Sequence, residues 1–131
     1  MPVSPACPEG LTVFTVDVLV QYLGNDQKAL AVVTKIVRDA VSSAREPFAR
    51  AVAALHDGRP ADTARILHGL RGSIGTLGAK RFVGAALAME LAIAEQRTEQ
   101  LPLLLAGVAS EFALALDSAD AWLSAHATPA A

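Results

Sequence analysis

Residues 60–79 read PADTARILHGLRGSIGTLGA, and this stretch decides the fold that we expect for the whole chain. Pro60 suits the first turn of a helix, and Gly78 suits its end. At about 100° per residue, the apolar side chains gather on one side. They predict a core stripe of Ile66, Leu67, Leu70, Ile74 and Leu77. His68 falls on the opposite side, so the pattern predicts an imidazole that points to water.

Small and basic residues surround His68 on its face of the predicted helix. They are Ala61, Ala64, Arg65, Arg71, Gly72 and Gly75. A glycine inside a helix costs about 1 kcal/mol relative to alanine. Gly72 and Gly75 therefore indicate a face kept open for another protein, whereas Gly69 lies off this face and is better explained by helix packing. Arg71 is one turn after His68, and its planar guanidinium matches phosphate oxygens.

Apolar residues at helical spacing predict four further helices. These cover residues 16–23, 26–56, 79–96 and 98–124. Asp26 is a suitable N-cap for the second helix, and Pro47 is expected to kink it rather than to divide it in two. The last helix has an apolar stripe of Leu101, Leu105, Val108, Phe112, Leu116 and Leu123. Because the connections are short, we expect an all-α fold: an antiparallel up-and-down four-helix bundle with a short additional N-terminal helix, over residues 11–125.

Composition narrows the function classes. The 131 residues are 53% apolar and 18% charged with a net charge of −2, which excludes a disordered chain and gives no general case for nucleic-acid binding. One cysteine, Cys7, cannot form an internal disulfide or a zinc-thiolate site. The carboxylates are scattered, and no two histidines have ligand spacing, so no metal site is expected. Basic residues are concentrated in 59–81, whereas 82–131 is acidic.

The two ends of the chain are expected to lie outside the bundle. Residues 1–10 contain three prolines and predict a flexible leader or linker, and residues 126–131 predict a flexible tail. A basic start followed by an apolar run is absent, so no signal peptide is expected. The most apolar stretches, 82–89 and 101–110, are shorter than the roughly 20 residues that span a bilayer. We therefore expect a soluble, cytoplasmic monomer.

The motif HGLRGSIGTLGA at residues 68–79 resembles the signature of histidine-containing phosphotransfer (HPt) domains of bacterial phosphorelays. That signature has a His, a Lys or Arg three residues on, a Gly directly after it, and a later Leu-Gly-Ala turn. The similarity continues at Phe82, Ala86, Met89 and Glu90, and upstream at Leu23-Gly24-Asn25-Asp26. It covers residues 16–124. Arg71 replaces the more frequent Lys, and Ile74 is bulkier than the usual Ala.

The resemblance implies a role for each motif residue. His68 would accept a phosphoryl group on Nε2 from the aspartyl phosphate of a receiver domain and pass it to another receiver. Arg71 would offset the phosphoryl charge, and Gly72 would keep the approach open. In related domains of chemotaxis-type kinases, a Glu that matches Glu90 accepts a hydrogen bond from Nδ1. A solvated surface acid is an equal alternative for Glu90.

The resemblance also defines the expected partners. These are response-regulator receiver domains, which would supply Mg²⁺, and the chain itself needs no cofactor and has no autonomous kinase activity. The basic segment 59–81 would suit the acidic rim of a receiver, with docking on a small apolar patch from the second and third helices. Whether the chain is a free protein or a C-terminal module of a hybrid histidine kinase stays open. The alternatives are a receiver-binding module without phosphate and a structural four-helix module.

Overall fold

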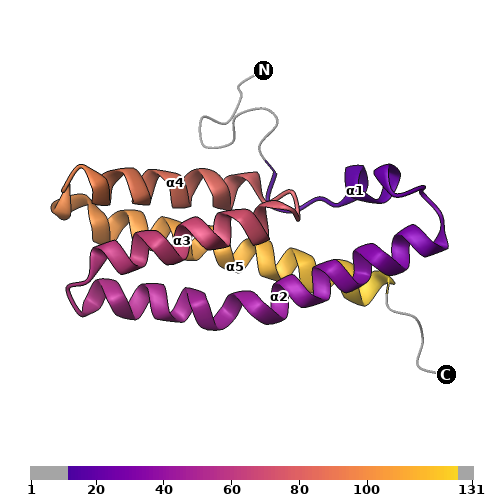
Figure 1. The fold of residues 1–131 in the computed structure, drawn as a ribbon, viewed down its shortest axis with the longest axis horizontal. Coiled ribbons are helices and arrows are strands. Elements are labelled where there is room, and N and C mark those ends of the chain that lie inside the picture. The colour runs from indigo at the N-terminus through magenta and orange to yellow at the C-terminus, as the bar shows by residue number, and fades with distance from the viewer. Residues whose placement is uncertain (1–11, 127–131) are drawn as a thin grey trace, which may run out of the picture.

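The computed structural model describes residues 12–126, and all regular secondary structure in this range is helical (Figure 1). The elements are α1 (Asp17–Tyr22), α2 (Gln27–His56), α3 (Pro60–Gly75), α4 (Lys80–Ala94), the 3-10 turn η1 (Thr98–Gln100) and α5 (Leu101–His126). The prediction of an all-α fold is confirmed. The expected leader 1–10 with Cys7, and residues 127–131 of the expected tail, lie outside the described residues.

The helix ends follow local chemistry. The side chain of Asp26 accepts a hydrogen bond from the Ala29 amide at 2.8 Å, so Asp26 is the N-cap of α2. Pro47 lies inside α2, which is one continuous helix, as predicted. α5 extends two residues beyond the predicted end, to His126. The His126 ring stacks on Trp122 with centroids 4.3 Å apart, which accounts for the additional residues.

Four helices lie lengthwise beside one another in Figure 1, and α1 lies against one end of α2. α2 contacts α3 and α5, and α4 contacts the same two helices from the other side. The predicted stripe of α3 is buried at Leu67, Leu70, Ile74 and Leu77, and Ile66 is partly buried. Phe48 of α2 stacks on Phe112 of α5 with centroids 4.1 Å apart. The core therefore fixes which side of α3 remains for solvent.

α5 and η1 together, Thr98–His126, are long and apolar enough to cross a membrane by length and composition. The most apolar 18-residue window has a mean hydropathy of 1.5. The uninterrupted apolar stretches 82–89 and 101–110 are each shorter than this window, so they did not predict it. The predicted stripe of this helix is in the core at Leu101, Leu105, Val108, Phe112 and Leu116. One third of that window is buried, so core packing accounts for part of its apolar character.

An extended segment before α1 is attached to the turn between α3 and α4. The Thr15 amide donates to the Leu77 carbonyl at 2.8 Å, and the Arg81 amide donates to the Thr12 carbonyl at 3.0 Å. Gly78 in this turn has φ +71°, and a Cβ there would collide with the Thr15 backbone. The sequence did not predict this attachment. Its hydrogen bonds lie at the α3–α4 turn, which follows His68 along the chain.

Candidate functional site

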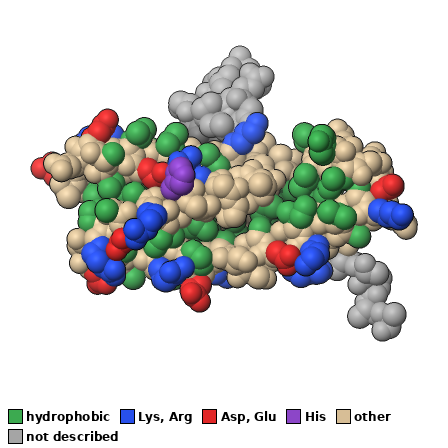
Figure 2. Space-filling view, viewed as in Figure 1, with side chains coloured by type: hydrophobic (Ala, Val, Ile, Leu, Met, Phe, Trp, Pro, Cys, Tyr) green, Lys and Arg blue, Asp and Glu red, His purple; other side chains and the backbone are tan. Residues whose placement is uncertain are grey.

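His68 lies in the middle of α3 on the side opposite the core. Its side chain is 73% exposed, as the helical spacing predicts. The neighbouring Leu67 is fully buried, so the helix cannot rotate to bury the imidazole without exposing its own apolar stripe. Figure 2 shows a histidine side chain on the surface, directly beside acidic and basic side chains. The position leaves the ring open to a large partner.

Arg71 and Glu90 form an ion pair that joins α3 to α4. Nε of Arg71 donates to Oε2 of Glu90 at 2.5 Å, and Nη2 donates to Oε1 at 3.0 Å. The side chains are 22% and 14% exposed, so the pair is largely shielded from water. The hydrogen bond to Glu90 raises the pKa of the Arg71 guanidinium; desolvation opposes this shift, and the charge of Glu90 adds to it. Arg71 is therefore a cation that Glu90 holds beside His68 in this structure.

The imidazole contacts this pair through Nδ1. Nη2 of Arg71 lies 2.7 Å from Nδ1, and Oε1 of Glu90 lies 3.5 Å from it. The structure thus brings together the three residues His68, Arg71 and Glu90. Glu90 is not a solvated acid, because its carboxylate is largely buried and held by Arg71. Its hydrogen bonds go to Arg71, and its distance to the ring exceeds a normal hydrogen bond.

The glycines of α3 differ from the expectation in two places. A Cβ added at Gly72 would meet nothing within 4 Å, so this position is open, as expected. A Cβ at Gly75 would lie 3.3 Å from Cγ2 of Val83, which makes Gly75 a packing position against α4 rather than open surface. Gly69 is open as well, so its assignment to helix packing is wrong. A helical wheel gives the direction of a side chain but not the position of the neighbouring helix.

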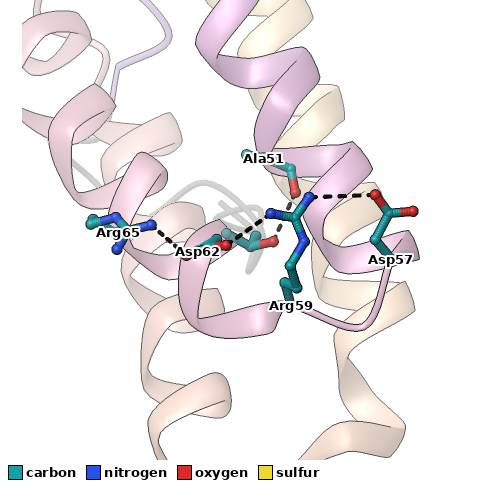
Figure 3. A network of polar contacts seen from close by, with 6 residues as sticks. Ala51, Asp57, Arg59, Asp62 and Arg65 are labelled. Carbon is teal, nitrogen blue, oxygen red and sulfur yellow. Dashed lines mark hydrogen bonds and ion pairs between the residues drawn. The ribbon is translucent and has the colours of Figure 1, made fainter.

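The other residues predicted to bind a partner lie towards the start of α3. Ala61 and Arg65 are exposed, and Ala64 is partly buried. Arg65 is not a free cation, because it pairs with Asp62 one turn earlier. Figure 3 shows Asp62 between Arg65 and Arg59 at the turn from α2 to α3.

The basic segment 59–81 is less positive than its charge count suggests. Arg59 pairs with Asp57 at 3.4 Å and with Asp62 at 3.1 Å. Arg81 on α4 pairs with Glu111 of α5 at 2.9 Å. Together with Arg65 and Arg71, every arginine of this segment has a carboxylate partner. These partners reduce the field that would attract an acidic protein, and the count of charges along the segment overestimates it.

Exposed apolar side chains near the site belong to α4. Leu87 and Leu91 are 42% and 49% exposed, and they flank Glu90 in the sequence. Among residues 12–126, α3 has no exposed large apolar side chain, and α2 has Val32, far along the helix from its contact with α3. The expected apolar patch from the second and third helices therefore contains no large exposed side chain of α3, and it stays a prediction. Figure 2 shows apolar side chains on the surface over α4.

The site combines the exposed imidazole of His68 with the largely shielded guanidinium of Arg71. In the part of the chain that the structure describes, no three His, Cys, Asp or Glu side chains gather closely enough to hold a metal ion. Glu90, the nearest carboxylate, is already neutralised by Arg71. The arrangement suits an imidazole that carries an anionic group.

Comparison with known proteins identifies the family. The family model described as Hpt domain matches residues 35–122, a range that contains His68, Arg71 and Glu90. No curated protein and no solved structure matches the chain. Domains of this family take part in histidine phosphotransfer within phosphorelays and interact with the receiver domains of response regulators. Because the match covers more than half of its length, this chain belongs to the Hpt domain family.

Proposed function

We propose that this protein is a phosphorelay intermediate that receives a phosphoryl group on His68 from one receiver domain and delivers it to another. The observation that carries the proposal is the exposed imidazole, 73% accessible, with the guanidinium of Arg71 2.7 Å from its Nδ1. Family membership supports the reaction class. The surrounding geometry supports His68 as the acceptor.

The transfer itself requires little covalent machinery from this chain. The lone pair of Nε2 attacks phosphorus, and the bond from phosphorus to the aspartate oxygen breaks with its electrons going to the carboxylate. Delivery to the second receiver is the same step in reverse. Such transfers depend mainly on positioning and charge compensation. Arg71 is the cation placed for that task, and the divalent ion would come from the receiver.

The receiver would dock on the α3–α4 face. Gly72 leaves the surface open next to His68, and Leu87 and Leu91 supply apolar contact area on α4. Ala61 and Arg65 extend the same exposed face towards the start of α3. Contacts of this kind are small and short-lived, which suits a carrier that must release each partner.

We further propose the wider setting. The four long helices form an antiparallel up-and-down bundle, and the folded domain covers residues 11–125 between a leader and a short tail, with α5 continuing to His126. The protein would act in the cytoplasm as a monomer, either alone or as a module of a hybrid histidine kinase. These statements extend the sequence-based expectations.

The test is phosphoryl transfer from a labelled receiver. Wild-type protein is incubated with a phosphorylated receiver, and the variants His68→Gln, His56→Gln and His126→Gln are treated identically. All three histidines are exposed, so the two latter variants are matched controls. We expect acid-labile, alkali-stable label in the wild type and in both controls, and none in His68→Gln. Label that persists in His68→Gln contradicts the site, and binding without label in the wild type indicates an interaction module.

A further inference from the structure

Arg71 contacts His68 on the ring nitrogen that the proposed transfer does not use. Its Nη2 lies 2.7 Å from Nδ1, within hydrogen-bond distance. A guanidinium has N–H donors and no acceptor, so Nδ1 must accept this hydrogen bond. A neutral imidazole accepts at one nitrogen and has its hydrogen on the other. The contact therefore selects the tautomer with hydrogen on Nε2.

This tautomer is the unreactive one for transfer at Nε2. When Nε2 has the hydrogen, its lone pair is not free to attack phosphorus. Nδ1 is no substitute, because Arg71 occupies it and it faces Glu90. In the geometry of the free protein, the imidazole is thus exposed to water but not prepared to react.

Glu90 favours the opposite tautomer. Its Oε1 lies 3.5 Å from Nδ1 and, as a carboxylate oxygen, can only accept a hydrogen bond. Nη2 of Arg71 binds this same oxygen at 3.0 Å and therefore lies between the carboxylate and the ring. If the guanidinium moves away, Oε1 is the acceptor next to a hydrogen on Nδ1. The two partners of Nδ1 compete, and they leave Nε2 in different states.

We propose that Arg71 is a positioning residue that holds His68 in the Nε2–H tautomer in the free protein, and that a docked receiver's phosphoryl group draws the guanidinium off Nδ1. The inference rests on the proposed function. Nε2 then loses its proton to water, Nδ1 gains one from water, and Glu90 accepts the Nδ1 hydrogen. The lone pair of Nε2 attacks phosphorus as the aspartate oxygen leaves with the bonding electrons. In the phosphohistidine, Nδ1 keeps its hydrogen and donates it in a hydrogen bond to Glu90.

The geometry of Arg71 suits both positions. Its Nη1 makes no hydrogen bond to the described residues, so the guanidinium has donors left for phosphoryl oxygens. Cε1 of the ring separates Nδ1 from Nε2, so Nη2 in its present position on Nδ1 does not contact a group on Nε2. A direct hydrogen bond from Nη2 to a phosphoryl group on Nε2 therefore requires that Nη2 leave Nδ1. One movement then supplies the cation and prepares the nucleophile.

The tautomer of the neutral His68 imidazole is measurable in the full chain by ¹⁵N–¹H NMR. We expect the Nε2–H form to predominate in the wild type. Arg71→Met, which keeps the apolar stem, should change the tautomer ratio about tenfold towards Nδ1–H. A wild-type ring with hydrogen on Nδ1, or an Arg71→Met ratio equal to that of the wild type, overturns the proposal.

Two further variants identify the acceptor. Arg71→Met combined with Glu90→Leu should lose the Nδ1–H form, and persistence of that form would show that Glu90 is not its partner. Arg81→Met removes a similarly shielded arginine from α4 and should leave the tautomer as in the wild type. An equal change in Arg81→Met would contradict a specific role for Arg71.

A measurement on the unmodified chain avoids any question of variant folding. A receiver with beryllium trifluoride in place of its phosphoryl group is added, and the His68 tautomer is followed. We expect conversion to Nδ1–H as the complex forms, and a ring that stays Nε2–H in the complex overturns the proposal. The free-protein spectra need no phosphodonor. They can therefore contradict the proposed tautomer while His68 still becomes labelled, so the two proposals can be overturned separately.

Discussion

Two arginine–glutamate pairs join α4 to its neighbours, and they differ in what lies beside them. Arg71–Glu90 connects α3 to α4, with side chains 22% and 14% exposed, and Arg81–Glu111 connects α4 to α5, with side chains 26% and 20% exposed. The burial of the two pairs is therefore closely matched, although Arg71 binds both oxygens of Glu90 and Arg81 binds Oε2 of Glu111. The first pair has an exposed imidazole 2.7 Å from the arginine, and the second lies at the other side of α4. The same ion pair can thus stabilise packing alone or also serve a reactive group.

The largest expected difference between the pairs is in phosphoryl transfer. Arg71→Gln should slow transfer from a phosphorylated receiver about 100-fold, because one donor to the developing phosphoryl charge is lost. Arg81→Gln should leave the rate within about twofold, as its guanidinium does not contact His68. Single-turnover kinetics with saturating receiver measures both. Equal slowing in the two variants would mean that the pair acts through the fold rather than at the site.

Stability should respond alike in the two regions. Glu90→Gln and Glu111→Gln each leave a partly buried arginine without its carboxylate, and each should lower the free energy of unfolding by about 1–3 kcal/mol. Urea titrations followed by circular dichroism provide the values. A lower free energy of unfolding in Glu111→Gln but not in Glu90→Gln would contradict this prediction, because the Arg71–Glu90 pair would then contribute nothing to packing.

Receiver affinity should distinguish the two faces of the bundle. Leu91→Ser, next to Glu90, should weaken binding of a receiver about tenfold through lost apolar contact. Leu103→Ser is the control, because Leu103 is 79% exposed and lies on α5 rather than on the proposed α3–α4 docking face. Calorimetric titration with a receiver gives both constants. A larger loss in Leu103→Ser would place the docking surface on α5.

The smallest expected effect concerns two open glycines. Gly72 follows Arg71 on α3, Gly107 lies on α5, and a Cβ at either would meet nothing within 4 Å. Gly72→Ala and Gly107→Ala should each raise stability by up to about 1 kcal/mol through helix propensity. Transfer should slow several-fold in Gly72→Ala alone. Unchanged transfer there would show that the space beside His68 is not needed by the receiver.

The sequence predicts the helices and the outward direction of His68 because both follow from the period of one helix. Leu67 and Leu70 repeat with that period and are buried, and His68 lies between them and is exposed. The contact of Arg71 with Glu90 joins residues 19 positions apart. It depends on the register of two packed helices, which a single-helix pattern does not contain.

The same limitation explains the errors at the glycines and in the charges. A helical wheel predicts an open Gly75 and a packed Gly69, and the structure shows the reverse, because the wheel does not contain the position of α4 relative to α3. The basic segment was overestimated because Glu90 and Glu111 lie outside it in sequence but beside it in space. The attachment of Thr12 and Thr15 to the α3–α4 turn was missed because backbone hydrogen bonds leave no side-chain pattern.

The central proposal is that His68 carries the phosphoryl group, and locating that group tests it most directly. Protein phosphorylated by a receiver is analysed by ³¹P–¹⁵N correlation NMR on the full chain, in which His56 and His126 are exposed internal controls. We predict phosphorus bonded to one nitrogen, Nε2 of His68. Phosphorus on His56, on His126 or on no histidine would contradict the account.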